Sequence, residues 1–151
     1  MSDRATVTGH TISRTVRIDS TPERVWDALT DTAQLGEWFG DSATMSKLAV
    51  GGTGEFDWEG YGTFPYEITE VKPNTVFAYR WSGEPATELR ADDSTIVRFT
   101  IETDGDTTVL TVTESGFDTI AGGLAHRRHR LEQNREGWNI EIDELLGMLG
   151  S

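Results

Sequence analysis

Glu114 is the residue whose type and position point most directly to chemistry. It follows Leu110 and Val112 at every second position, and this period of two places its carboxylate on the buried face of a strand. An unpaired charge in a protein interior is costly, so the carboxylate needs a partner. Arg14 has the same inward parity in the alternating segment 10–19 and is a candidate partner in a structural ion pair. The alternative is a Glu114 that acts as a general acid or base, or as an anchor for a ligand.

The other residues that could do chemistry form a basic run at 126–130. On a helix, His126 and His129 at spacing i, i+3 share a face, but no HExxH pattern or acidic triplet supplies further metal ligands. The preferred interpretation is a solvated helix face or a counterweight to nearby acidic charge. The chain has no cysteine, no G-x-S-x-G elbow and no Gly-rich phosphate loop. We therefore expect no metal and no cofactor.

Aromatic residues recur on one face of several alternating segments between 53 and 101. Such stripes usually fill a core, but the polar tips of Tyr and Trp also suit a partly wet cavity. Trp38 and Phe39 end a short helical segment before Gly40, and we expect them to gate the mouth of that cavity. The predicted ligand-binding set is Trp38, Phe39, Trp58, Phe64, Tyr66, Phe77, Tyr79, Trp81, Phe99, Glu114, Trp138 and Ile142.

The stretch 136–149 must position much of this set. Its apolar residues Trp138, Ile142, Leu145, Leu146 and Leu149 recur at i, i+4, i+7, i+8 and i+11, which is one stripe of an α-helix, and the opposite face is acidic. The stripe needs an apolar surface to pack against, and the alternating strands upstream provide a large one. The sequence therefore predicts an α+β fold in which a curved sheet closes over the last helix and leaves a hollow between them.

The remaining segments give the order of elements. A strand at 10–19 is followed by a helix from Pro22 to about Thr30, with a capping signal at 20–23, and by a second short helix that stops at Gly40. From Ser42 to Ser115 apolar and polar residues alternate with a period of two, and turns at Gly60 and other breaks divide this stretch. The pattern predicts about six strands. The terminal helix follows a segment that contains glycines 122 and 123.

Length and charge limit the class of protein. With 151 residues, the chain is expected to form one domain over 1–151. Its net charge of −13 repels nucleic acid and anionic lipid headgroups, and no apolar run is long enough to span a bilayer. We expect no nucleic-acid or membrane partner and, with no targeting segment visible, a cytoplasmic location.

An ordered set of short motifs resembles a known superfamily. The motifs are PERVWDALTD at 22–31, WFG at 38–40, GG at 51–52, EVKP at 70–73, YRW at 79–81, ESGF at 114–117 and GW at 137–138. From about Thr11 to Leu149 the chain resembles the START-like (SRPBCC) superfamily, in the branch of activators of the heat-shock protein 90 ATPase. The resemblance implies the helix-grip fold: a seven-stranded antiparallel sheet wraps the C-terminal helix, encloses a mostly apolar cavity and has its first and last strands as neighbours. That strand arrangement favours the structural Arg14–Glu114 ion pair over a chemical role for Glu114.

The resemblance leaves several functions open, because relatives include lipid carriers, hormone receptors and polyketide cyclases. The expected function is to bind a small apolar or aromatic molecule, as a carrier, a sensor or a sequestering protein. One alternative is a cyclase or hydrolase in which Glu114 and Tyr66 or Tyr79 steer protons. Another is an interaction domain whose acidic surface docks a chaperone or regulator. The chaperone-activating members carry a separate N-terminal domain that is absent here, which counts against chaperone activation.

Overall fold

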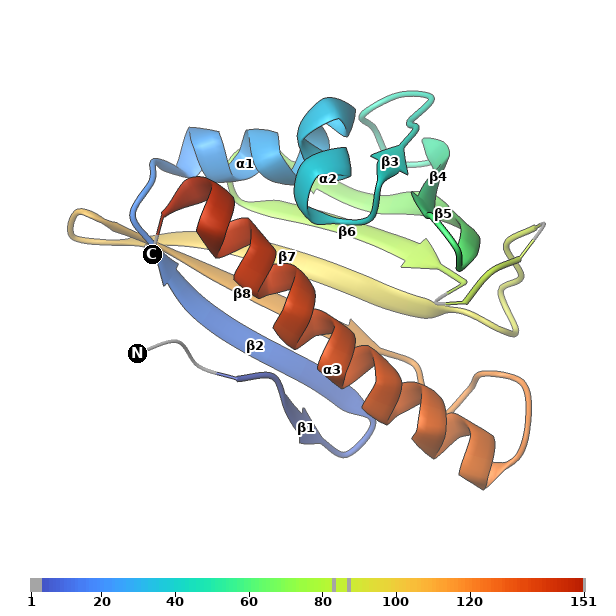
Figure 1. The fold of residues 1–151 in the computed structure, drawn as a ribbon. Coiled ribbons are helices and arrows are strands. Elements are labelled where there is room, and N and C mark those ends of the chain that lie inside the picture. Colours follow the sequence, from blue (N-terminus) through green and yellow to red (C-terminus); the bar gives the residue numbers. More distant parts are fainter. Residues whose placement is uncertain (1–3, 83, 87, 151) are drawn as a thin grey trace.

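An antiparallel sheet and one long helix form the body of the molecule (Figure 1). The computed structural model describes residues 4–82, 84–86 and 88–150. The elements in chain order are β1 (Thr6–Thr8), β2 (Thr11–Ile18), α1 (Pro22–Thr30), α2 (Thr32–Trp38), β3 (Ser42–Ala43), β4 (Thr53–Trp58), β5 (Gly62–Lys72), β6 (Val76–Trp81), β7 (Thr95–Asp104), β8 (Thr107–Ser115) and α3 (Leu124–Leu149). This arrangement confirms the predicted α+β helix-grip fold.

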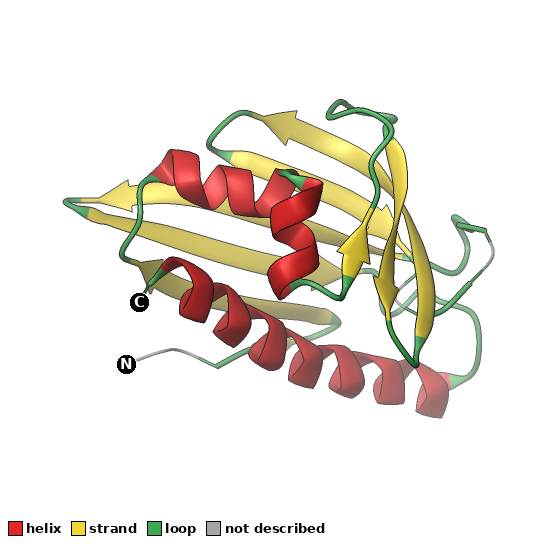
Figure 2. Cartoon of the chain, turned by 45° about the horizontal axis from the view of Figure 1, so that its top comes forward, coloured by secondary structure: helices red, strands yellow, loops and turns green. Residues whose placement is uncertain are grey.

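The strands lie in the order β1-β2-β8-β7-β6-β5-β4-β3, and every neighbouring pair is antiparallel. The first long strand, β2, pairs with the last, β8, so that Ile12 lies opposite Glu114. A register shift between Ile68 and Glu70 interrupts the β5–β6 ladder, and such irregularities bend a strand. Figure 2 shows the sheet curving around α3, with α1 and α2 beside α3 on the same side.

The described part of the chain has eight strands, one more than the seven expected. The addition is β1, which lies at the sheet edge and pairs with β2 from Thr6↔Ser13 to Thr8↔Thr11. Gly9 makes the turn between them with φ 62°, a conformation that glycine adopts without steric cost. A three-residue strand is too short to show a period of two, which is why sequence patterning did not predict it.

The first of the two short helices begins where the capping signal predicts, and the second ends at Trp38, just before the predicted stop at Gly40. The hydroxyl of Thr21 accepts a hydrogen bond from the Arg24 amide (3.2 Å), and Pro22 occupies the first turn of α1. Asp31 ends α1 and caps α2, since its carboxylate accepts from the Ala33 amide at 3.1 Å. The WFG segment that follows packs against the sheet through ring contacts of Trp38 with Phe99 and of Phe39 with Phe56.

The apolar stripe of α3 is buried, as predicted. Trp138, Ile142, Leu145 and Leu149 all belong to the hydrophobic core, whereas Ile140 on the opposite side is 55 % exposed. The helix begins at Leu124, well before the stripe, and its largely exposed first turns lie near the loops that follow β6 and β8 (Figure 1). This extension places polar residues of α3 beside the end of the sheet.

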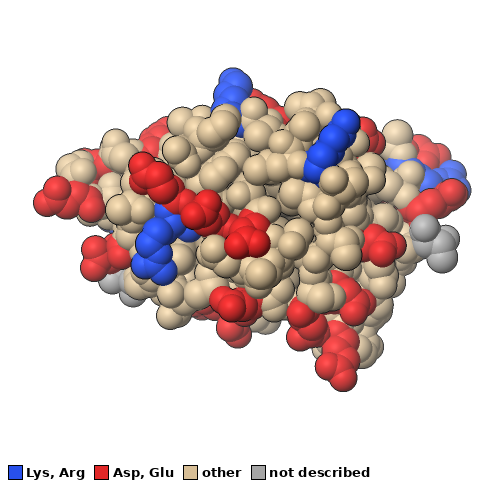
Figure 3. All heavy atoms as spheres, turned by 90° about the horizontal axis from the view of Figure 1, so that it is seen from above, with Lys and Arg blue, Asp and Glu red and all other residues tan. Residues whose placement is uncertain are grey.

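Acidic side chains dominate the charge of the protein, which carries 26 Asp and Glu against 13 Lys and Arg. On the face that carries α1 and α2, Asp and Glu are scattered around the surface among a few Lys and Arg (Figure 3). No helix in the described part of the chain has the length and apolar character needed to cross a membrane.

Candidate ligand-binding site

A cavity of about 440 Å³ lies between α3 and the strand ends of β4, β5 and β6. Its walls are mainly aromatic: the six rings of Phe39, Trp58, Tyr61, Phe64, Trp81 and Trp138 line it. The other lining residues are Glu84, Pro85, Gln133, Asn134, Gly137, Ile140 and Glu141. Most of these come from one face of α3 and from the loop after β6. This cavity, called the aromatic pocket below, has the volume and lining of a small-molecule site.

Contacts between the rings fix the walls of the aromatic pocket. Phe64 stacks on Trp81 at a centroid distance of 5.7 Å and meets Trp58 edge-on at 4.8 Å. On the helix side, Phe39 stacks on Trp138 at 5.4 Å. Such pairs stabilise by about 0.5–1.5 kcal/mol each beyond their area burial. The walls are therefore held in place without a ligand.

At Gly137 no side chain projects from the helix wall of the pocket. A Cβ atom added to this glycine would meet nothing within 4 Å, although the residue lies in the middle of α3 and lines the pocket. Glycine inside a helix destabilises it by about 1 kcal/mol relative to alanine. Any larger side chain at this position would project into open space beside the pocket.

The structure separates the predicted ligand-binding set into two groups. Five members line the aromatic pocket, namely Phe39, Trp58, Phe64, Trp81 and Trp138. The other seven are buried and do not line it, namely Trp38, Tyr66, Phe77, Tyr79, Phe99, Glu114 and Ile142. The strand residues of both groups share inward parity, so parity alone does not decide which of them face the pocket.

Sequence reasoning missed several pocket residues. On α3, Asn134, Gly137 and Glu141 accompany Trp138 at helical spacing and share its face, so the period of 3.6 could have identified them. Tyr61, in the turn between β4 and β5, gave no such signal. It is 77 % exposed, and its place at the rim depends on how that turn folds back.

Trp38 does not lie at the mouth of the pocket. Its side chain is buried, its Nε1 donates to the Ala28 carbonyl oxygen at 2.7 Å, and its ring meets Phe99 edge-on. The helical insertion packs against the sheet more tightly than its short helices led us to expect. The exposed aromatic side chain at the rim is Tyr61.

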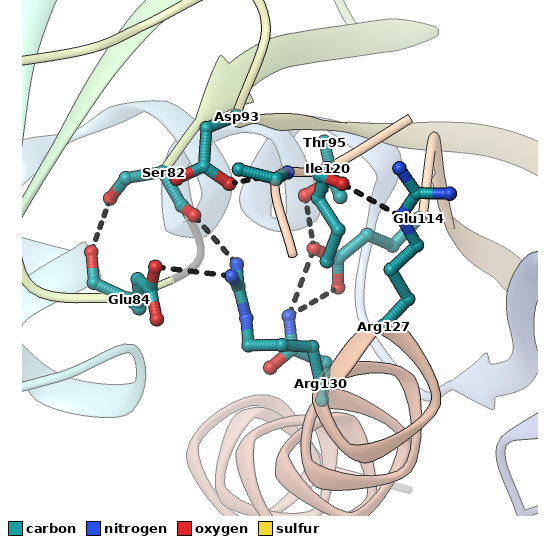
Figure 4. Close-up of polar contacts among 10 residues, drawn as sticks. Ser82, Glu84, Asp93, Thr95, Glu114, Ile120, Arg127 and Arg130 are labelled. Atoms are coloured by element: carbon teal, nitrogen blue, oxygen red, sulfur yellow. Dashed lines mark hydrogen bonds and ion pairs between the residues drawn. The ribbon is translucent and has the colours of Figure 1, made fainter. Parts of the chain in front are cut away.

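Glu114 lies directly behind the pocket wall and is 0 % exposed. Its Oε2 accepts from Trp81 Nε1 (2.9 Å) and Thr95 Oγ1 (2.5 Å), and its Oε1 accepts from Trp138 Nε1 (2.8 Å). Asn134 Nδ2 donates to both oxygens, at 3.1 and 3.2 Å. Figure 4 shows Thr95 directed at this carboxylate. Neutral donors thus satisfy the buried carboxylate, and two of them are the tryptophans that form the pocket walls.

The predicted Arg14–Glu114 ion pair is wrong. Arg14 Nη2 instead lies 2.7 Å from Asp143 Oδ1, and its Nη1 donates to the carbonyl oxygens of Trp138 and Asn139 at 3.4 and 3.0 Å. In the β2–β8 ladder Arg14 lies opposite Val112, one inward position away from Glu114. At that position α3 crosses the sheet and offers acceptors of its own. Parity gave the correct face for both residues but not their partners.

Glu141 is the titratable residue that lines the pocket with a shifted pKa. Burial raises the pKa of its carboxyl from the ordinary 4.5 to about 7, the Trp58 hydrogen bond opposes the shift, and Glu144 and Asp41 add to it. Trp58 Nε1 donates to Glu141 Oε1 at 3.2 Å. Burial also raises the pKa of Tyr66 and Tyr79 above that of free tyrosine. Glu141, rather than a tyrosine, can therefore exchange a proton near neutral pH.

Part of the basic run is buried and contacts the loop after β6. Arg130 is buried, its Nη2 donates to the Ser82 carbonyl oxygen (2.8 Å), and its Nη1 lies 3.2 Å from Glu84 Oε1 in an ion pair without well-directed hydrogen-bond geometry (Figure 4). Arg127 Nε donates to the Ile120 carbonyl oxygen. The interpretation as a solvated helix face fits the exposed residues 126, 128 and 129 and is wrong for Arg130. No cluster of three metal-ligating side chains occurs among the described residues.

Comparison with solved structures supports the fold. The chain is similar to a protein of Mesorhizobium loti (23 % identity, TM-score 0.72, covering 89 % of this chain and 93 % of that one). It is also similar to the Aha1 dimer from Colwellia psychrerythraea (22 % identity, TM-score 0.66, covering 92 % of this chain and 92 % of that one). A third similar structure is an HSP90 activator from Plasmodium falciparum (21 % identity, TM-score 0.71, covering 94 % of this chain and 97 % of that one).

Comparison with sequence families identifies the family of the chain. No curated protein matches the chain by sequence. Residues 19–150 match the family model described as activator of Hsp90 ATPase homolog 1-like protein. This match covers the chain from the end of β2 to the end of α3, and so includes every element that forms the pocket. The chain therefore belongs to the activator of Hsp90 ATPase homolog 1-like family of the START-like (SRPBCC) superfamily.

Proposed function

We propose that the protein binds a small apolar or aromatic molecule in the aromatic pocket and acts as a carrier, sensor or sequestering protein. The observation that carries this proposal is a pocket with six aromatic rings in its walls beside a helix position occupied by glycine. Ligand sites in proteins typically measure about 300–1,000 Å³ and combine apolar walls with a few polar groups. Gln133, Asn134 and Glu141 are such polar groups here.

The substitution Gly137→Leu tests this proposal. The leucine side chain would occupy the open space beside Gly137, whereas Gly147→Leu places the same side chain on the exposed side of α3, also with nothing within 4 Å. Neither change should destabilise the helix, because leucine is a better helix former than glycine. The probe is N-phenyl-1-naphthylamine, a neutral aromatic molecule whose fluorescence increases in apolar surroundings.

We expect the wild type and Gly147→Leu to bind the probe with equal affinity and Gly137→Leu to lose at least about tenfold in affinity, equivalent to about 1.4 kcal/mol. Urea unfolding of each variant verifies that the fold is intact. Equal binding by Gly137→Leu would place the probe elsewhere, and absence of binding by the wild type would count against an apolar ligand site.

A second candidate is an enzyme that uses the same pocket, and the position of Glu141 favours it. A general acid or base works best with a pKa near the working pH, and Glu141 lines the pocket with a pKa of about 7. Glu114 is less suited, since it is fully buried and both its oxygens accept hydrogen bonds. A molecule that is retained through purification and then incubated with the protein distinguishes the two functions. Chemical conversion of this molecule by the wild type but not by Glu141→Gln favours the enzyme. Recovery of the molecule in unchanged form favours the binding protein.

A further inference from the structure

We propose that the preferred occupant of the aromatic pocket is an organic cation, a molecule with a positively charged nitrogen on an apolar or aromatic body. The inference rests on the proposed binding function and names the ligand class. Three features support it: the signs of the charges around the pocket, the polar groups already engaged with the protein, and the affinity of aromatic rings for cations.

The charged side chains that line the pocket are both acidic. Among its described lining residues there is no Lys, Arg or His, and the two charged residues are Glu84 and Glu141. Glu84 is balanced by Arg130, whose Nη1 lies 3.2 Å away. Glu141 differs, because its hydrogen-bond partner is the neutral indole of Trp58. One carboxylate at the pocket is thus paired with a cation and the other is not.

The surroundings of Glu141 add negative charge. Asp41, after α2, and Glu144, one turn further along α3, are exposed carboxylates whose charge acts on Glu141. Behind the wall, Glu114 is held by neutral donors. In a site of low dielectric these groups favour a positive ligand and oppose a negative one.

The hydrogen-bond donors of the pocket are largely occupied. The indole N–H groups of Trp81 and Trp138 donate to Glu114, and that of Trp58 donates to Glu141. The side-chain amide of Asn134 also donates to Glu114. A ligand carboxylate would therefore find few free donors, which disfavours anions on grounds independent of charge. Donation to a carboxylate also polarises each indole and increases its electron density.

The rings themselves attract cations. Quaternary ammonium groups bind to cages of aromatic side chains, of which tryptophan is the most effective. Three of the six lining rings are tryptophans, Trp58, Trp81 and Trp138. An ammonium group among these rings would also lie beside the Glu141 carboxylate.

A dependence on pH follows from the same geometry. Burial raises the pKa of Glu141 to about 7, so the side chain ionises between about pH 6 and pH 8. A cation binds the ionised form better. Its affinity should therefore rise as the pH rises through this window, while that of a neutral ligand of the same shape should stay constant.

Three probes with one naphthyl body test the proposal: (2-naphthylmethyl)trimethylammonium, neutral 2-naphthylmethanol and anionic 2-naphthylacetate. Their charges are fixed between pH 6 and 8. Each is titrated calorimetrically into the wild type, Glu141→Gln and Glu136→Gln in 150 mM salt, which weakens attraction to the acidic surface. Glu136 is the matched control because it lies on the same helix, is exposed, does not line the pocket and is not among the charges that act on Glu141.

At pH 8 we expect the ammonium probe to bind at least about tenfold more tightly than the alcohol, and the acetate more weakly than either. Glu141→Gln should reduce the preference for the cation at least about fivefold, and Glu136→Gln should reduce it by less than about twofold. Lowering the pH to 6 should weaken cation binding to the wild type and leave Glu141→Gln unchanged.

Tighter binding of the alcohol or the acetate would overturn the cation preference and leave the proposed binding function intact. Cation binding that persists in Gly137→Leu would assign the probe to the acidic surface and also refute the inference. If none of the three probes binds, the binding function fails together with the preference.

Discussion

Replacing Glu114 by glutamine tests the hydrogen-bond network behind the pocket. The carboxylate receives bonds from Trp81, Thr95, Asn134 and Trp138, but an amide has one acceptor oxygen. If that oxygen takes the place of Oε2, it keeps Trp81, Thr95 and Asn134. The amide nitrogen then faces Trp138 Nε1, so two donors oppose each other and an indole N–H loses its partner.

The magnitude follows from these contacts. One buried donor without a partner costs about 1–3 kcal/mol, and three remaining bonds that lose a charged acceptor weaken by about 1 kcal/mol each. Removing the buried charge returns a few kcal/mol of desolvation free energy. We therefore expect Glu114→Gln to lower the free energy of unfolding by about 2–3 kcal/mol.

Urea unfolding followed by far-UV circular dichroism measures this change without relying on tryptophan emission. In a Trp138→Phe background the opposing donor is gone, so Glu114→Gln should cost about 1–2 kcal/mol less than in the wild type. In a Trp58→Phe background, where the deleted N–H bonded to Glu141, its cost should be unchanged within about 0.5 kcal/mol. A neutral or stabilising Glu114→Gln, or equal costs in all three backgrounds, would refute the proposed network.

Three further predictions concern individual side chains. Trp138→Ala should destabilise the protein by about 3–5 kcal/mol, because the ring is 3 % exposed and its N–H binds Glu114; a loss below about 1 kcal/mol in urea unfolding would contradict its place in the core. Gly54→Ala should cost about 2–4 kcal/mol, since its Cβ would lie 2.0 Å from the Thr44 carbonyl oxygen, and an unchanged melting temperature would show that the strand can shift. For Glu141 the folded-state pKa is raised to about 7 from 4.5, so its contribution to stability is fully present below about pH 4.5 and is lost as the pH rises through 7. Glu141→Gln should therefore be more stable than the wild type at pH 8, by about 1–2 kcal/mol after allowance for solvent screening, and equal to it near pH 5; a pH-independent difference in thermal unfolding would refute the shift.

Much of the fold follows from local patterns in the sequence. The stripe of α3 and the cap at Thr21 predicted their helices, because both signals depend on residues within a few positions of each other. The strand β1 escaped prediction, since three residues carry no usable period and its formation depends on pairing with β2.

The site is less predictable, because it depends on how elements cross. Inward parity identified Glu114 and Arg14 correctly as buried. The partners of Arg14 lie on α3, and those of Glu114 lie on α3, β6 and β7, so both sets depend on tertiary packing. Parity likewise grouped Phe77 with Phe64, although the first fills the core and the second lines the pocket. Gly137 was visible in the sequence, yet a single glycine marks an opening only when the facing surface is known.

Native mass spectrometry of the protein purified from its own source tests the binding function most directly. We predict one small molecule bound per chain in the wild type and in Gly147→Leu, and none in Gly137→Leu, where the new side chain fills the space beside the pocket. The mass of that molecule also identifies its class. The same bound molecule in Gly137→Leu, or the bare chain mass in all three proteins, would contradict the account.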